Sequence, residues 1–362
     1  MKRKRDNDDE GEIREDRLGE LPDCILHNIL SFLSAKGAVQ TSVLSPRWKY
    51  LWKRLPTLRL HSYRSHFRHL NQFTKFVSRI LSLRDGSTSI HTLNFHRGGL
   101  VEPHIVKRVI NYAVSHNVKE IFIEVKCDIK HFPPCLFSSH TLTSLKLALV
   151  HPKTYAMRAL FPNSLDLPSL TTLCLHMFAF SVGDDGRAEP FSALKKLNTL
   201  IIDKCEVVDA QNLWILNTTL VNLTIVIRDY PPDDCIEIEL STPNLCTFRF
   251  IGSPFHKFHG SKSNLSSIKH VDIDLRLMAS SAKYSLFLLD WLVELANVES
   301  MTLSSPTLQV LFLVPNLLNV ELPSLCNLKS LKVIRKQTSI IPDGMVQFLI
   351  QNSTSAKVEI ID

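Results

Sequence analysis

The chain has 362 residues, of which 44% are hydrophobic and 21% charged, and its 42 Lys and Arg against 35 Asp and Glu give a formal net charge of +7. Its length suggests about two domains. Only 11 glycines and 18 prolines exclude a collagen-like or low-complexity chain, and the hydrophobic share excludes wholesale disorder. No apolar run approaches the ~18 residues of a membrane span, and the first residues lack the apolar core of a signal peptide. We therefore expect a folded protein that neither enters a membrane nor is exported.

The eight cysteines are scattered without a C-x-x-C pair, which argues against a disulfide framework and against a zinc site. A reducing nucleus or cytoplasm fits this usage. Asn217, Asn222, Asn264 and Asn352 each open an N-x-[ST] sequon, and in such a compartment we expect none of them to carry a glycan.

Positive charge is concentrated near the N-terminus. The stretch from Cys24 to Arg84 contains 11 Lys and Arg and no Asp or Glu, so the rest of the chain sums to −4, which is 7 minus 11. Such a block can be a solvated surface, a nucleic-acid footprint or the docking site of an acidic protein.

The first 15 residues carry charges of both signs and almost no large apolar side chain, which predicts a disordered tail. Its Lys2-Arg3-Lys4-Arg5 run is a candidate nuclear-import patch.

Three short helices are predicted next. Apolar residues at helical spacing indicate a helix from Pro22 to about Leu33, with Pro22 in a first turn, and a second from Gly37 to Leu44. A third begins with Ser45 as N-cap and Pro46 at the first position. These helices carry more apolar surface than they can cover themselves, so they are either covered by residues beyond 60 or form a protein interface.

Residues 16–60 carry four recognisable blocks: the Leu21-Pro22 start, Ile29 to Leu33, Thr41 to Ser45, and Arg47-Trp48 with Leu51-Trp52. With these blocks the segment resembles the F-box of plant proteins. The resemblance implies docking on an acidic Skp-type adaptor, and through it on the cullin and RING subunits of an SCF-type ubiquitin ligase. Carried over position by position, it implies an internal role for Leu33, Leu44, Leu51 and Trp52, and contact with the adaptor for Leu21, Pro22, Ile25, Ile29, Leu30, Val43 and Trp48.

An L-x-x-L-x-L pattern, with other large apolar residues allowed for Leu, recurs ten times between residues 90 and 333. Its starts lie 23 to 30 residues apart, which is the period of leucine-rich repeats, where each unit supplies one strand to a curved parallel sheet. The ninth position, usually Asn or Cys, holds Cys205 in one unit only, so we expect irregular convex connections without the usual ladder.

Alternation along each strand places the fourth and sixth positions in the core and the third and fifth on the concave face. That face offers aromatic, aliphatic and charged residues suited to a protein or small ligand. The candidate substrate-binding residues are Phe122, Lys146, His176, Ile201, Asp203, Arg249 and Asp272.

The predicted fold class is α/β: a three-helix F-box followed by an irregular leucine-rich-repeat solenoid with a curved parallel sheet. Its parts are a tail (1–15), the F-box (16–60), a linker with a capping helix at 70–83 (61–88), the repeats (89–340) and a C-terminal cap (341–362). Further helices are expected at 103–115, 285–296 and 343–351, and an edge strand at 356–361. The later repeats and this cap resemble plant F-box/leucine-rich-repeat proteins, many of which also carry an FBD module, for which we expect no room before Asp362.

No phosphate-binding loop, zinc-protease motif or nucleophile elbow occurs, so we expect no enzyme, no metal and no cofactor. The leading hypothesis is the substrate-recognition subunit of an SCF-type ligase in the nucleus, the cytoplasm or both, with the repeats binding a protein target. The alternative is a repeat scaffold that acts without ubiquitin transfer. Nucleic-acid binding through the basic block remains as a third hypothesis, although we expect no such partner.

Overall fold

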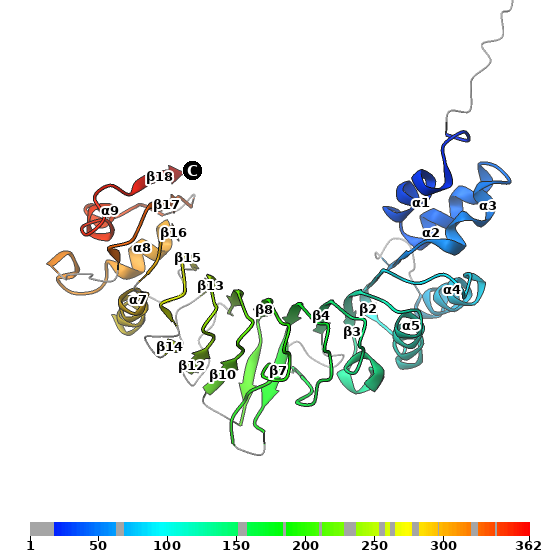
Figure 1. The fold of residues 1–362 in the computed structure, drawn as a ribbon, viewed down its shortest axis with the longest axis horizontal. Coiled ribbons are helices and arrows are strands. Elements are labelled where there is room, and N and C mark those ends of the chain that lie inside the picture. Colours follow the sequence, from blue (N-terminus) through cyan, green and yellow to red (C-terminus); the bar gives the residue numbers. More distant parts are fainter. Residues whose placement is uncertain are drawn as a thin grey trace, which may run out of the picture.

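The computed structural model describes residues 18–62, 69–150, 158–183, 186–209, 212–227, 237–252, 258–260, 265–276, 282–295, 297–319, 325–336 and 339–362. The predicted tail at 1–15, the candidate import patch and the sequon at Asn264 lie outside these ranges. The described elements form an arc, with the long sheet along its inner rim and helices along its outer side (Figure 1).

The described strands of the inner rim form one parallel sheet of twelve strands, and the F-box helices stand at one end of the arc and β18 at the other. The chain contributes them in sequence order, one per repeat, as expected of a repeat solenoid. In sheet order they are β1 (Thr57–Ser62), β2 (Thr92–Leu100), β3 (Glu120–Lys126), β4 (Ser144–Val150), β6 (Thr172–His176), β8 (Thr199–Asp203), β11 (Asn222–Val226), β13 (Thr247–Gly252), β15 (His270–Leu275), β16 (Ser300–Ser304), β17 (Ser330–Ile334) and β18 (Lys357–Ile361).

All ten L-x-x-L-x-L units become strands of this sheet, and the expected edge strand at 356–361 is β18. Within a unit the fourth and sixth positions are buried, as Leu200 and Ile202 of β8 illustrate. A single backbone carbonyl joins each pair of neighbouring units: that of Thr171, for example, accepts the N–H groups of Asn198 and Thr199 at 2.8 and 3.0 Å. The repeat period therefore sets both the core and the strand register.

The F-box is built from α1 (Asp23–Ser31), α2 (Ala35–Gln40) with the 3₁₀ turn η1 (Thr41–Val43), and α3 (Trp48–Leu51) with η2 (Trp52–Arg54). The second and third helices each end in a tighter turn, so the expected three-helix module is met in outline only. The Ser34 hydroxyl caps α2 by accepting the N–H of Gly37 at 3.2 Å.

Strand β1 lies at the end of the segment expected as the F-box and extends two residues beyond it. Thr57 to Ser62 alternate half-buried and buried side chains and pair in parallel with β2, from Thr57 opposite Thr92 to Ser62 opposite Arg97. Residues at the end of the expected F-box thus form the first strand of the solenoid, because Leu58 and Leu60 share one face and are both buried there.

Helices cover the outer side of the first repeats. The predicted helices at 70–83 and 103–115 are confirmed as α4 (Leu70–Leu83) and α5 (Pro103–Ser115). The apolar stripe of α4, with Phe73 and Val77 fully buried, closes the N-terminal end of the core. The 3₁₀ turns η3 (Ile129–His131) and η4 (Pro134–Leu136) follow behind β3.

The outer side of the middle repeats is made of short strands instead. Two further three-stranded parallel sheets lie there, in the orders β5-β7-β9 and β10-β12-β14. Their strands are β5 (Ala159–Leu160), β7 (Phe178–Ser181), β9 (Glu206–Val208), β10 (Asn212–Leu216), β12 (Glu237–Ser241) and β14 (Phe258–Gly260). These sheets supply the extended convex pieces that the irregular repeats predicted.

The last repeats return to helices, namely α7 (Ala282–Glu294), α8 (Ser305–Leu311), the 3₁₀ turn η5 (Leu317–Asn319) and α9 (Met345–Leu349). The first and last of these helices were predicted, with boundaries shifted by a few residues, whereas α8 was not.

A hydrogen-bond ladder does connect the repeats, at a position other than the ninth. The residue just before the first apolar position of a unit reaches back to the preceding repeat: Thr141 and Thr219 donate through Oγ1 to the carbonyls of Val118 and Leu197, each at 2.9 Å. Ser267 donates likewise to Leu245 at 2.8 Å, and Asn297 to Ser266 at 2.9 Å. Hydroxyl and amide side chains therefore satisfy the loop carbonyls.

Candidate functional site

The F-box exposes large apolar side chains on its surface. Val43 has 87% of its surface accessible, Phe32 70% and Leu44 61%, although such residues are normally covered in a folded domain. With the other members they form what we call the F-box apolar surface, made of Leu18, Pro22, Ile25, Ile29, Phe32, Leu33, Val43 and Leu44.

Most residues expected to contact the adaptor lie at this surface: Pro22, Ile25, Ile29 and Val43 are exposed and Leu21 is half-buried. The other two residues expected to contact the adaptor, Leu30 and Trp48, are instead buried in the F-box core. They support the surface from below.

Among the residues expected to be internal, Leu51 and Trp52 are buried. Leu44 is exposed, since it follows the short turn η1 that turns its side chain outward, and Leu33 lies just past α1 with more than a third of its surface accessible. Helical spacing did not separate these cases, because every helix here has apolar residues on more than one face.

Arg47 fixes the start of the F-box. Its guanidinium contacts Asp23 Oδ1 at 2.6 Å and donates hydrogen bonds to the carbonyl of Gly19 and, at 2.5 Å, to that of Leu21. One side chain at the start of the third helix thus holds the turn before α1 in place, which positions Leu21 and Pro22.

The seven residues expected on the concave face all lie there, in two rows across the sheet. Because the strands are in parallel register, equivalent positions are neighbours. The fifth-position row contains Phe122, Lys146, Ile201, Arg249 and Asp272, and the seventh-position row, which continues the same alternation, contains His176 and Asp203.

Opposite charges on this face are paired. His176 Nδ1 lies 2.6 Å from Asp203 Oδ2, and Arg249 Nε lies 3.0 Å from Asp272 Oδ2. Burial raises the pKa of the Asp272 carboxyl above its usual range, against the opposing effect of Arg249. Lys336 pairs with Asp274 one row further on, at 3.3 Å. The C-terminal half of the face is thus largely neutralised.

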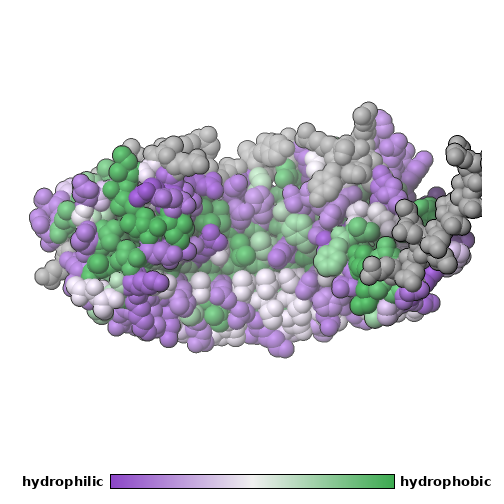
Figure 2. Space-filling view, turned by 90° about the horizontal axis from the view of Figure 1, so that it is seen from above, coloured by the Kyte–Doolittle hydropathy of each residue, from purple (hydrophilic) through white to green (hydrophobic). Residues whose placement is uncertain are grey.

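The middle of the face is different in character. Lys146 is exposed, and its neighbours in the row are Phe122 and Cys174, with Ala148 and Ile201 close by in the register. Seen into the arc, hydrophobic residues follow the middle of the molecule, with hydrophilic residues on both sides (Figure 2). An accessible amine among partly exposed apolar side chains is typical of a protein-recognition surface.

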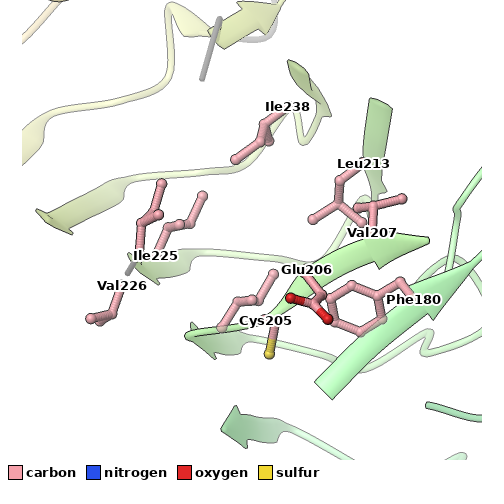
Figure 3. A pocket seen from close by; sticks show the side chains of 10 residues that line it. Phe180, Cys205, Glu206, Val207, Leu213, Ile225, Val226 and Ile238 are labelled. Carbon is pink, nitrogen blue, oxygen red and sulfur yellow. The ribbon is translucent and has the colours of Figure 1, made fainter. Parts of the chain in front are cut away.

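An apolar pocket lies between the twelve-stranded sheet and the convex strands. Phe180, Val207, Leu213, Ile225 and Ile238 surround it, with Cys205 and Glu206 at one side (Figure 3). Burial raises the pKa of the Cys205 thiol to about 12, so this thiol is protonated at neutral pH.

Burial likewise raises the pKa of the Cys127 thiol to about 12. Over the described ranges, no group of three or more His, Cys, Asp or Glu could hold a metal ion, and no helix is long and apolar enough to cross a membrane. The arrangement is suited to binding by two surfaces.

Comparison with known proteins agrees with this arrangement. Residues 18–60 match the family model described as the F-box domain. An F-box/LRR-repeat protein of Arabidopsis thaliana is 30% identical over 309 residues, which are 82% of this chain and 63% of that protein, and a second is 27% identical over 82% of this chain and 80% of its own length. The chain thus contains an F-box domain and is similar to plant F-box/LRR-repeat proteins, spanning 63% of the length of the first of these relatives.

The similarity also includes relatives with an FBD module. An F-box/FBD/LRR-repeat protein of the same plant is 26% identical over 89% of this chain, which spans 72% of that relative. The similarity thus extends from the F-box through most of the repeats.

Proposed function

We propose that this chain is the substrate-recognition subunit of an SCF-type ubiquitin ligase. In this proposal the F-box apolar surface binds a Skp-type adaptor, and through it the cullin and RING subunits, while the concave face binds a protein target. The protein acts in the nucleus, the cytoplasm or both.

One observation carries the proposal: an uncovered apolar surface on the F-box stands at one end of an arc whose inner rim is a continuous parallel sheet. Burying a side chain such as Val43 or Phe32 stabilises a complex by about 1.5–3 kcal/mol. Several such residues together provide enough surface for a stable interface.

The chain needs no catalytic residue for this role. Holding a target on one surface and the remaining ligase subunits on another raises the effective concentration of the target lysine near the activated ubiquitin. The mixed apolar and charged strip around Lys146 supports the concave face as the target-binding surface.

The experiment is proximity labelling in plant cells with the wild-type chain and with Val43→Asp, which blocks the F-box apolar surface at its most exposed residue. We expect a set of proteins labelled by both chains to accumulate in cells expressing the variant, because they are bound but no longer ubiquitylated. Ile201→Asp on the concave face should abolish labelling of that set.

The competing function is a repeat scaffold that binds partners without ubiquitin transfer. It predicts the same labelled proteins at unchanged abundance in the wild type and the Val43→Asp variant. The decisive proteins are those whose labelling is lost with Ile201→Asp. If their abundance and ubiquitylation are the same with the wild type and with Val43→Asp, the ligase proposal is overturned.

A further inference from the structure

A basic hollow lies between the F-box and the end of α4. Its lining comes from α1 (Asp23 and His27), from the segment of α3 and η2, and from residues 83–85 that follow the helix. Four of the lining residues are cations, namely Arg47, Lys53, Arg54 and Arg84.

Only two of these cations have a carboxylate partner among the residues that the structure describes. Arg47 contacts Asp23 at 2.6 Å, and Arg54 contacts Asp85 at 3.0 Å. Lys53 lies over the ring of Tyr50, 5.1 Å from its centroid, and neither it nor Arg84 has a described carboxylate within 4 Å. Two positive charges in the lining are therefore uncompensated.

Arg84 is the more unusual of the two, because 8% of its surface is accessible. Its Nη2 donates to the Leu55 carbonyl at 2.7 Å, while its Nε is buried and has no described hydrogen-bond partner. His27 Nε2, in the same lining, is also buried without a described partner. A buried charge is costly unless an opposite charge or further hydrogen bonds compensate it, and among the described residues no carboxylate compensates the Arg84 guanidinium.

We propose that this hollow binds the phosphate group of a phosphorylated small molecule. A phosphate monoester carries about −1.5 to −2 charges at pH 7, which balances Lys53 and Arg84, and a carboxylate carries only one. Its acceptor oxygens suit the ammonium of Lys53 in the lining, and the largely buried Arg84 guanidinium contributes its positive charge from the wall of the hollow.

The hollow is distinct from the F-box apolar surface. At about 100° per residue, Asp23 and His27 lie on one side of α1, while Ile25, Ile29 and Phe32 lie on the opposite side. An adaptor bound to the apolar surface would therefore leave the hollow open. The Asp85 N–H already donates to the Lys53 carbonyl at 3.1 Å, so a bound phosphate adds contacts across the junction between F-box and solenoid.

The test is titration of the full-length chain with inorganic phosphate at constant ionic strength, followed by calorimetry and by thermal unfolding. We expect saturable binding and a higher melting temperature, with Lys53→Ala weakening the affinity at least tenfold. Lys49→Ala is the matched control, because its amine lies 5.5 Å from the same Tyr50 ring but outside the hollow, and it should bind as the wild type does. Arg84→Gln should abolish binding, and Lys53→Ala decides the matter if that variant does not fold.

Three ligands separate the possible sources: inorganic phosphate, glycerol phosphate and vesicles containing a phosphoinositide. Tighter binding of glycerol phosphate supports the proposal, whereas binding of the vesicles alone overturns it in favour of a lipid surface. Absence of saturable phosphate binding, or equal binding by Lys53→Ala and Lys49→Ala, overturns it. Loss of adaptor affinity on Lys53→Ala without phosphate binding would instead assign the hollow to an acidic protein segment.

Discussion

Single side chains hold neighbouring repeats together, and Asn217 is the clearest case. It is buried, its Nδ2 donates to the carbonyls of Phe191 and Leu194 at 3.2 and 2.9 Å, and its Oδ1 accepts the N–H of Thr219 at 3.0 Å. An amide used in this way has no room for a glycan, in line with the expectation for its sequon.

Asn217→Ala should therefore lower the free energy of unfolding by about 3 kcal/mol, because it leaves buried carbonyls without donors. Asn222→Ala is the control: its amide, at the partly exposed start of β11, bonds to Asn198 and Thr199, and its loss should cost less than about 1 kcal/mol. Urea unfolding of both variants measures the difference, and equal losses would contradict the role given to Asn217.

A second residue-scale prediction concerns pH. Hydrogen bonds from Lys329 at 2.6 Å and from Lys269, with Nζ at 3.4 Å, lower the pKa of the Glu299 carboxyl below its ordinary value of 4.5. A lowered pKa in the folded state adds stability above the unfolded-state value, and this stability is lost as the pH falls through the folded-state pKa.

Glu299→Gln should accordingly lower the melting temperature at pH 7 and have little effect at pH 3, with a smaller difference at high salt because the pairs are exposed. Thermal unfolding of wild type and variant across this pH range checks the prediction. A difference that does not change with pH would contradict it.

Which side chains are buried and which are exposed was predictable from sequence for the strands, and less so for the F-box helices. Strand alternation alone places Phe122 and Lys146 on the concave face, since it depends only on backbone geometry. Whether Leu30 or Leu44 is buried depends on how the short helices cross, which spacing along one helix does not fix. The ladder position was readable, because Ser, Thr or Asn precedes nine of the ten repeat units, the unit at Leu197 with its Lys196 being the exception.

At the scale of elements, helices were predicted where an apolar stripe at helical spacing coincides with residues that favour a helix start or end. Helix α5 begins at Pro103 and buries one face, so its sequence defines both its start and its core side. Helix α8 escaped prediction because Thr307 and Ser305 interrupt its apolar pattern: Thr307 Oγ1 is buried and donates to the Ile273 carbonyl at 2.9 Å. The convex strands β5 and β9 are too short to leave a pattern.

Helix α4 should act as a local cap. Phe73 is fully buried, stacks on Phe95 with 6.0 Å between ring centroids, and lies 4.7 Å from the Arg97 guanidinium. Phe73→Ala should cost about 3–5 kcal/mol at this end of the solenoid.

Because each strand pairs only with its neighbours, hydrogen exchange in Phe73→Ala should accelerate in β1 and β2 and stay unchanged in β16 and β17. Val333→Ala, in the buried row of β17, is the mirror-image control and should affect the other end. Uniform acceleration along the chain would show that the solenoid unfolds as one unit.

At the scale of the whole molecule, the arc separates two surfaces that a single sheet connects. Strand β1 joins the F-box to the solenoid without an intervening linker, so the F-box apolar surface is held at a defined place relative to the concave face. Part of the net charge of +7 is located at this junction, since several cations of the block from 24 to 84 lie between the two modules.

The most direct test of the account is the dissociation constant between a purified Skp-type adaptor and the full-length chain. Val43→Asp should weaken it at least 100-fold, because it places an unpaired charge in the interface. Ile340→Asp, at a residue 79% accessible at the other end of the solenoid, should leave it unchanged. An affinity for the Val43→Asp variant equal to that of the wild type would contradict the assignment of the F-box apolar surface.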